Sequence, residues 1–317
     1  MSGKKFNVVF CGTPDFSVPT LELLHNHPSI NLVSVISMPD RPAGRGQKLQ
    51  SPPVVAYAKE QKIPFFQTEN INKEEDFLNS LNIQKVDFFV VLAFAQFLGS
   101  KVLNLPKLGC FNIHTSLLPK YRGAAPIQYA LLNGDQTTGV SIQKMVKKMD
   151  AGNVVKSHEI PVSIEETGGQ LYTRLKFQAA LTMNELIKDV ETNSITEREQ
   201  DESKVSFAPT LKKQDGHLLF AEQDFNSIHN KVRALKPWPG TFCFMNKKRL
   251  KVIEIEKYQI NKLAPGELSL NENMLLIGCK DATIRLTRVQ LEGKKAAEDK
   301  DLVNGLLNSN TKEFELS

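Results

Sequence analysis

The sequence has little of what marks several specialised classes of protein. Its 317 residues include only four cysteines and one tryptophan. The cysteines are widely separated and form no C-x-x-C pair, which disfavours a disulfide framework and a structural metal site, and no metal cofactor is implied. No stretch approaches the ~18 to 20 consecutive apolar residues of a membrane-spanning helix. The first residues, MSGKKFNVVFCG, lack the long apolar core and cleavage site of a signal peptide, so we expect a cytoplasmic protein.

Two common enzyme motifs are also missing. The turn after the first apolar run, GTPDF, has only one of the glycines of G-x-G-x-x-G, which disfavours dinucleotide binding. There is no G-x-S-x-G, the turn that presents the nucleophilic serine of α/β-hydrolases. These absences favour chemistry without a dinucleotide and without an activated serine.

The composition is that of a soluble, mildly basic protein with real hydrophobic cores. Hydrophobic residues make up 41% of the chain, charged residues 24%, and the formal net charge is +5. The length favours two domains, and the charge permits an acidic partner without requiring one. No exposed apolar stripe is apparent from the pattern, so we expect a monomer.

Two patterns along the chain predict two kinds of domain. Over residues 1–192, apolar strand-like runs alternate with helical patterns, which predicts an α/β domain with a mainly parallel sheet. The run VDFFVVLAF, Val86 to Phe94, is typical of a central strand covered on both faces. Residues 193–207 are almost entirely polar and are predicted to be a linker. Short strand-like runs over 208–317 predict a small β-barrel domain.

The second domain carries most of the positive charge. Between Lys204 and Lys295 the sequence has 17 Lys and Arg residues against 9 Asp and Glu. A solvated charged surface would explain this excess, but a basic barrel after a ligand-binding sheet also suits a polyanion held by both domains.

The stretch GCFNIHTSLLPKYRG, Gly109 to Gly123, places two polar side chains where a strand ends. Side chains alternate along a strand, so Asn112 and His114 share one face. Pro119 then interrupts regular pairing and a loop opens. Ligands of open α/β sheets bind at such strand ends. An isolated N-x-H pair is more often a packing pair than a catalytic one, so the rest of the chain has to decide its role.

A carboxylate follows at a suitable spacing. Asp150 lies 36 residues after His114, and a strand, helix and strand of about 30 residues returns the chain to the same edge of a sheet. If the three side chains converge, the amide and an imidazolium can both donate to a developing oxyanion while the carboxylate holds the imidazole. Such a site suits acyl transfer, with the substrate itself as the attacking group.

Five motifs resemble one family across nearly the whole chain: FCGTPDFSVPTLELL, PDRPAGRG, FNIHTSLLPKYRGAAPIQ, RALKPWPG and GKKA. The sequence resembles the formyltransferases that use 10-formyltetrahydrofolate, and among them those that formylate initiator methionyl-tRNA. The resemblance implies a Rossmann-like formyltransferase domain followed by an OB-like β-barrel that binds tRNA. It also implies a role in translation initiation, with 10-formyltetrahydrofolate as formyl donor.

The resemblance implies roles for particular residues. The family's catalytic asparagine, histidine and aspartate match Asn112, His114 and Asp150. The folate site it implies comprises Phe94, Ala95, Gln96, Ser116, Leu117, Leu118 and Pro119. The expected tRNA contacts are Arg41, Arg45 and Lys48 in the loop PDRPAGRGQK, and Lys247, Lys248 and Arg249 in the second domain.

Some residues depart from the family pattern. Thr115, Lys120 and Tyr121 stand where the family commonly has glycine, arginine and tryptophan, which leaves charge and aromatic character in place. Phe94 and Ala95 stand where a tyrosine and a glycine are frequent, which changes the expected folate pocket.

Two other interpretations remain open. One is a formyltransferase for an amino sugar nucleotide or for glycinamide ribonucleotide, and the other is a non-catalytic RNA-binding protein. The loop at Asp40 to Lys48 and the basic second domain favour tRNA over a small amine, and the intact Asn112, His114 and Asp150 favour an enzyme.

Overall fold

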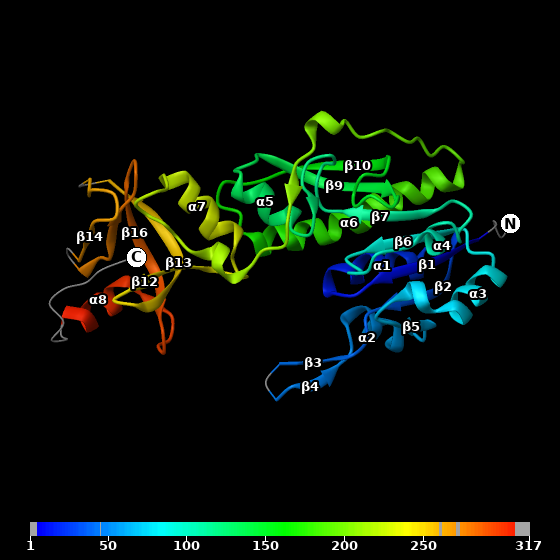
Figure 1. Cartoon of the computed structure of the whole chain (residues 1–317), viewed down its shortest axis with the longest axis horizontal. Helices are drawn as coiled ribbons and strands as arrows, with labels where there is room; N and C mark the ends of the chain where they lie inside the picture. The colour runs from blue at the N-terminus through cyan, green and yellow to red at the C-terminus, as the bar shows by residue number, and fades with distance from the viewer. Residues whose placement is uncertain (1–4, 45, 260–261, 271–272, 308–317) are drawn as a thin grey trace. The chain divides into compact units, whose positions relative to one another are not determined.

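A computed structural model describes residues 5–44, 46–259, 262–270 and 273–307 (Figure 1). Within these ranges the chain forms two compact units. The first comprises Met1–Pro126, Thr137–Pro161 and Tyr172–Ala208, and the second Ile127–Gln136, Val162–Leu171 and Pro209–Ser317. The sequence predicted a catalytic domain over 1–192, a linker over 193–207 and a second domain over 208–317. Each compact unit combines separate segments of the chain, so the units do not test these bounds, which stay a prediction.

The first unit contains a sheet of seven strands in the order β10-β9-β7-β6-β1-β2-β5. The strands are β1 (Phe6–Gly12), β2 (Ile30–Ser37), β5 (Phe65–Gln67), β6 (Phe88–Leu92), β7 (Cys110–His114), β9 (Thr137–Lys144) and β10 (Val154–Pro161). From β5 to β7 the neighbours pair in parallel, and β9 and β10 add an antiparallel edge. The predicted α/β class with a mainly parallel sheet is confirmed.

Strand β6 lies between β1 and β7, and all five of its residues are buried. On one face Phe89 and Val91 belong to a core cluster with Leu78, Leu81 and Val102. The alternate residues point to the other face and are buried as well. The prediction of a central strand covered on both faces is therefore confirmed, because the continuous apolar run leaves no polar face for solvent.

Helices connect these strands, and the apolar periodicity did not predict α4. Their bounds are α1 (Val18–Asn26), α2 (Pro53–Glu60), α3 (Glu75–Ile83), α4 (Ser100–Leu103), α5 (Pro126–Leu132) and α6 (Gly168–Glu191), with single turns η1 (Asp15–Ser17), η2 (Ile71–Lys73) and η3 (Glu202–Lys204). The short strands β8 (Arg122–Gly123) and β11 (Phe207–Ala208) pair in parallel. Strand β10 was not predicted from the sequence.

The segment predicted as an irregular loop is a β-hairpin. Strands β3 (Arg41–Ala43) and β4 (Lys48–Gln50) pair in antiparallel register, and the ribbon extends from the body of the first unit (Figure 1). Pro42 would break a central strand, but a proline is compatible with an isolated two-stranded ribbon because one side of each strand needs no partner. The hairpin's side chains, where described, are exposed.

The second unit is built on a curled antiparallel sheet with the order β12-β13-β16-β15-β14, and β17 pairs with β16 (Figure 1). Its elements are η4 (Lys213–Gly216), α7 (Phe225–Ala234), β12 (Thr241–Met245), β13 (Lys248–Tyr258), β14 (Leu268–Ser269), β15 (Leu276–Gly278), β16 (Thr283–Leu291), β17 (Ala297–Glu298) and α8 (Asp299–Leu307). One apolar cluster fills the unit and includes Ile228, Leu250 and Val303 from α7, β13 and α8. Helix α8 was not predicted.

The described residues contain neither a membrane-spanning helix nor a cluster of metal ligands. None of the helices in those ranges is long and apolar enough to cross a membrane. In the same ranges no group of three or more His, Cys, Asp or Glu side chains is arranged to hold a metal ion.

A buried ion pair anchors α8 to β16. Asp299 is only 1% exposed and accepts hydrogen bonds from Arg285 Nε at 2.7 Å, Arg285 Nη2 at 3.0 Å and the Leu275 N–H at 3.2 Å. Burial raises the pKa of Asp299, but the hydrogen bonds from Arg285 and Leu275 outweigh burial and leave that pKa below its ordinary value. The stabilisation that this ion pair contributes therefore depends on pH.

We predict that Asp299→Asn lowers the unfolding free energy near neutral pH by about 3 kcal/mol, because Arg285 loses a buried charged partner. A carboxylate with a lowered folded-state pKa stabilises above its unfolded pKa, and this contribution is lost as pH falls below about 4. Trp238, the only tryptophan, lies in the second unit, so urea unfolding followed by its fluorescence measures the effect. The difference in unfolding free energy between wild type and variant should become smaller near pH 3. A difference that stays the same at pH 3 would contradict a stabilising role for the ionised Asp299.

Candidate active site

Strand β7 presents Asn112 and His114 from the middle of the sheet. Asn112 lies opposite Val91 of β6 and Gln143 of β9, and His114 lies opposite Ser141. Two residues apart on one strand, both side chains point to the same face. His114 is buried and Asn112 is half-buried.

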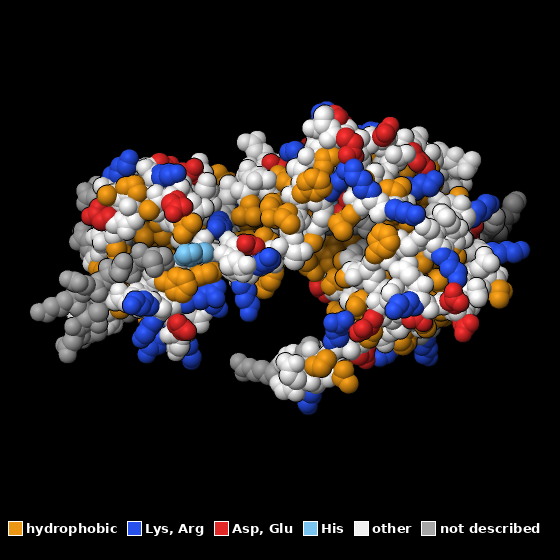
Figure 2. Space-filling model, viewed as in Figure 1, with side chains coloured by type: hydrophobic (Ala, Val, Ile, Leu, Met, Phe, Trp, Pro, Cys, Tyr) orange, Lys and Arg blue, Asp and Glu red, His pale blue; other side chains and the backbone are white. Residues whose placement is uncertain are grey.

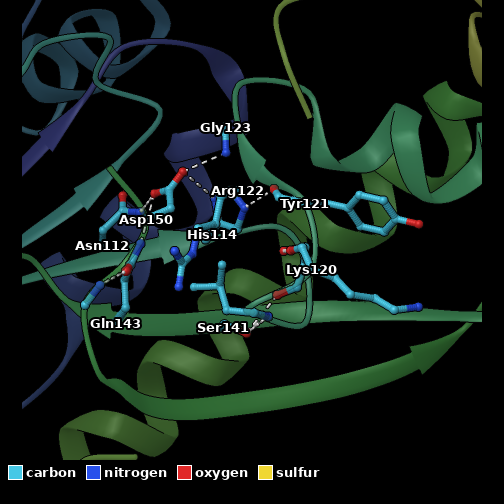
Figure 3. Close-up of polar contacts among 12 residues, drawn as sticks. Asn112, His114, Lys120, Tyr121, Arg122, Gly123, Ser141, Gln143 and Asp150 are labelled. Atoms are coloured by element: carbon cyan, nitrogen blue, oxygen red, sulfur yellow. Dashed lines mark hydrogen bonds and ion pairs between the residues drawn. The ribbon is translucent and has the colours of Figure 1, made fainter. Parts of the chain in front are cut away.

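Asp150 meets both side chains from the turn that follows β9 (Figure 3). Its Oδ1 lies 3.4 Å from Asn112 Nδ2, and its Oδ2 lies 3.8 Å from His114 Nδ1. The backbone at Asp150 has φ +50°, a left-handed conformation that aspartate adopts more readily than most residues. The structure thus brings the three residues singled out in the sequence into one cluster.

The hydrogen bonds of His114 define which nitrogen faces the carboxylate. His114 Nε2 lies 2.8 Å from the carbonyl oxygen of Tyr121. A carbonyl oxygen only accepts, so Nε2 carries a hydrogen and donates it. The other ring nitrogen, Nδ1, faces Asp150 at 3.8 Å.

The chain after β7 folds back to support the carboxylate. The Gly123 N–H donates to Asp150 Oδ2 at 2.9 Å. Gly123 has φ +123°, and a Cβ there would lie 2.6 Å from the Ala208 carbonyl oxygen. Only glycine fits this conformation and this close approach to β11.

A second set of contacts holds the backbone of the Asp150 turn. Gln200 Nε2 donates to the carbonyl oxygens of Asp150 (2.9 Å) and Gly152 (2.7 Å). Arg122, 2% exposed, donates from Nε and Nη2 to Gln200 Oε1 at 3.0 and 2.8 Å. Arg122 Nη2 also pairs with Glu202, and hydrogen bonds from Arg122 and Lys148 lower the pKa of Glu202 to about 2. Gln200 and Glu202 lie in the segment predicted as a linker, and neither was singled out in the sequence.

The residues predicted for folate binding have mixed environments. Ser116 donates its hydroxyl to the Lys120 carbonyl at 2.6 Å, and the Leu118 N–H donates to Ser141 Oγ at 3.0 Å. The side chains of Ser116 and Leu118 are buried, and those of Leu117 and Pro119 are half-buried. This segment is a turn that supports the strand end.

The other predicted folate segment follows β6. Phe94 is buried in the core cluster, and Ala95 is exposed with φ +63°. Gln96 donates to the Thr68 carbonyl at 2.6 Å and accepts from the Ile71 N–H at 2.8 Å, so its amide holds the segment in place. The next residue, Phe97, is 62% exposed. Ala95 occupies a conformation that glycine adopts without cost, consistent with the glycine expected there from the family pattern.

A cavity of about 670 Å³ opens beside β7 in the first unit. Apolar side chains of Leu103, Met145 and Val146 line it, and Cys110 does so from two residues before Asn112. Burial raises the pKa of Cys110 to about 12, so it is a neutral thiol. Lysines also line the cavity, at positions Lys107, Lys144 and Lys147. Sequence reasoning missed these residues, although Met145 and Val146 stand as apolar residues in the polar turn before Asp150.

The predicted tRNA contacts fall on both compact units. In the first, Arg41 lies 3.6 Å from Glu69 and Lys48 is exposed, whereas Arg45 lies outside the described residues. In the second, Lys247 and Lys248 are exposed on the β12–β13 hairpin. Arg249 instead stacks over the ring of Phe242 at 3.7 Å and is half-buried.

Two family models match this chain. Residues 4–187 match the formyl transferase model, and residues 210–307 match the model of the formyl transferase C-terminal domain. The chain belongs to the formyltransferase family. The match to the first model includes β7, β9 and the turn that carries Asp150.

Several relatives align with this formyltransferase over most of its length. It is 39% identical to the methionyl-tRNA formyltransferase of Thermotoga maritima over 95% of each chain. It is 36% identical to that of Geobacter metallireducens, over 94% of this chain and 95% of the relative. Among solved structures, an N-formyltransferase of Helicobacter canadensis in complex with folinic acid and dTDP-3-aminofucose gives a TM-score of 0.66 at 20% identity, covering 88% of this chain and 98% of that one. At this identity the last comparison shows the shared fold alone.

Proposed function

We propose that this formyltransferase transfers the formyl group of 10-formyltetrahydrofolate to the α-amino group of methionine on initiator methionyl-tRNA, for translation initiation. The observation that carries the proposal is the cluster of Asn112, His114 and Asp150 in a chain 36 to 39% identical to methionyl-tRNA formyltransferases over nearly its whole length.

The cluster supports acyl transfer by direct attack of the substrate amine. The Asn112 amide donates to the oxyanion that develops when the amine attacks the formyl carbon. His114 Nδ1 is the nitrogen able to gain or donate a proton, and Asp150 stabilises the imidazolium 3.8 Å away. The proton leaves the attacking amine and reaches the departing folate nitrogen through His114 and Asp150 or a water they hold. These roles are our assignment for the three residues.

The cavity beside β7 supports a folate site. Its apolar lining suits a flat heterocycle, and Lys107 and Lys147 suit the carboxylates of a glutamate tail, whereas Lys144 is paired with Glu197 of the same lining at 2.8 Å. Cys110 lines the cavity two residues before Asn112 on β7, whereas Asn112, His114 and Asp150 are not among its lining residues. We assign Leu103, Met145 and Val146 to this site in addition to the segments around Phe94 to Gln96 and Ser116 to Pro119.

The β3–β4 hairpin and the basic second unit support tRNA as the acceptor. The hairpin carries Arg41 and Lys48 with an exposed apolar residue, Leu49, which is 72% exposed. Lys and Arg side chains gather along the lower edge of the second unit in Figure 2. Such cations suit the phosphates of an RNA helix. We propose that the curled sheet is an OB-like barrel with this role, and that the enzyme is a cytoplasmic monomer.

The alternative is formyl transfer to a small amine such as an amino sugar nucleotide or glycinamide ribonucleotide. The cluster around Asp150 would serve either acceptor equally. A small amine does not require an extended cationic hairpin, so this feature favours tRNA.

The direct test is formyl transfer by the purified full-length protein from 10-formyltetrahydrofolate to three acceptors: charged initiator tRNA, an amino sugar nucleotide and glycinamide ribonucleotide. We expect formyl-methionyl-tRNA as the product, measured after hydrolysis of the ester. A protein that formylates only one of the small acceptors would overturn the proposal, and a protein that binds tRNA without product would support the non-catalytic interpretation.

We predict that Asn112→Ala lowers kcat about 10² to 10³-fold, because one oxyanion donor is lost in the transition state. The KM for folate should change less than about twofold, since the amide contributes little to ground-state binding. Steady-state kinetics measure both. The matched variant Asn82→Ala removes an exposed amide on α3 and should match wild type. A rise in folate KM with an unchanged kcat would assign Asn112 to binding instead.

We predict that Arg41→Ala combined with Lys48→Ala raises the KM for tRNA about tenfold or more and leaves the KM for folate unchanged. For each phosphate that the variant no longer neutralises, the slope of log affinity against log salt concentration should become shallower by about one. Filter binding at several salt concentrations measures the slope. Lys188→Ala, which removes an exposed cation from α6, is the matched control. Equal effects of the double variant and the control would remove the hairpin from the tRNA site.

A further inference from the structure

Gln143 is a buried polar residue next to the cluster, and the mechanism above gives it no role. It lies on β9 opposite Asn112 and is 2% exposed. Its Nε2 donates to Asp150 Oδ1 at 2.9 Å, and its Oε1 accepts from the Gly152 N–H at 2.9 Å (Figure 3). A single side chain therefore contacts both the carboxylate and the backbone of the Asp150 turn.

The Gly152 contact determines the orientation of the amide. A backbone N–H only donates, so the atom of Gln143 that faces Gly152 is the oxygen. The NH₂ group must then face the carboxylate. The reversed amide would place two donors together at Gly152 and two acceptors together at Asp150, which costs two hydrogen bonds in a buried position.

The two oxygens of Asp150 consequently have different partners. Oδ1 takes the short hydrogen bond from Gln143, and Oδ2 takes the Gly123 N–H and faces His114. Asn112 lies 3.4 Å from Oδ1, a longer and weaker contact than the one Gln143 makes. Because Gln143 already satisfies Oδ1, the Asn112 amide is free to turn toward an oxyanion.

We propose that Gln143 is a positioning residue for formyl transfer: it orients the Asp150 carboxylate so that Oδ2 faces His114, and it keeps the Asn112 amide available for the oxyanion. This proposal rests on the function proposed above. Without the Gln143 donor, the carboxylate can rotate about its last torsion, which is broad, and Asn112 becomes the remaining side-chain donor to Oδ1. Both changes act on the chemical step and leave the binding of either substrate in place.

If Gln143 only supported the fold of the turn, its hydrogen bond with Gly152 would be the contact that matters. Two variants distinguish this structural role from the positioning of Asp150. Gln143→Glu keeps an oxygen for the Gly152 N–H but places a second carboxylate against Asp150. Gln143→Met keeps a side chain of similar length and removes both hydrogen bonds. If Gln143 serves only to hold the turn, Gln143→Glu is close to wild type and Gln143→Met is the damaged variant.

The experiment measures kcat, both KM values and the urea unfolding midpoint for the wild type and the two variants. We expect kcat to fall about tenfold or more in Gln143→Met, as the loss of one hydrogen bond to a charged group implies, and at least as far in Gln143→Glu. Both KM values should stay within about twofold. The control is Ile142→Val, which removes one buried methylene from the same strand without touching Asp150, and which should lower stability but not kcat.

A kcat loss in Gln143→Met no larger than in Ile142→Val at matched stability would overturn the proposal. Wild-type kcat in Gln143→Glu would overturn it only at a pH where kcat no longer changes with pH, because the protonated carboxyl of that variant can donate to Asp150 in place of the amide. If Gln143→Glu does not fold, the comparison of Gln143→Met with Ile142→Val decides alone. Failure of the proposed function is recognised separately, because the wild-type protein itself would then yield no formyl-methionyl-tRNA.

Discussion

A carboxylate that is largely withdrawn from water needs a donor for each of its oxygens, and the first unit of this protein is arranged around meeting that need for Asp150. Oδ1 receives the amide of Gln143, and Oδ2 receives the N–H of Gly123 while facing His114. These donors come from β9 and from β8, which are separated by helix α5 in the chain. The pairing of β7 with β9 is what makes them neighbours.

The same requirement explains residues that have no direct part in chemistry. The backbone carbonyls of the Asp150 turn need donors too, and Gln200 supplies them. Gln200 is in turn oriented by the buried guanidinium of Arg122, which donates two hydrogen bonds to Gln200 Oε1. A chain of hydrogen bonds thus extends from Glu202 to the backbone carbonyls of the Asp150 turn, so each member is restrained by the next. The segment 193–207, polar enough to look like a linker, is polar partly because it supplies these groups.

Substrate choice depends on other parts of the molecule. The chemistry proposed for the cluster around Asp150 does not distinguish one attacking amine from another, whereas a small acceptor does not require the extended cationic hairpin. Exposed cations lie on both compact units: Arg41 and Lys48 on the β3–β4 hairpin, Lys247 in the β12–β13 turn and Lys248 at the start of β13. The chemistry and the proposed selection of tRNA are therefore carried by separate elements, which permits each to be altered by substitution without the other.

The sequence by itself determined the local features. The apolar run Val86 to Phe94 implied a central strand, alternation put Asn112 and His114 on one face, and motif resemblance indicated the family. Those inferences succeed because side-chain periodicity and short motifs are properties of neighbouring residues. Tertiary structure decided the rest: that Asp150 meets Asn112 and His114, that Gln143 and Gln200 brace its turn, and that a cavity opens beside Cys110. It also paired Arg41–Ala43 with Lys48–Gln50, where proline and glycine indicated an irregular loop. These features depend on strand order and register, which bring distant residues within hydrogen-bonding distance and which no short stretch of sequence encodes.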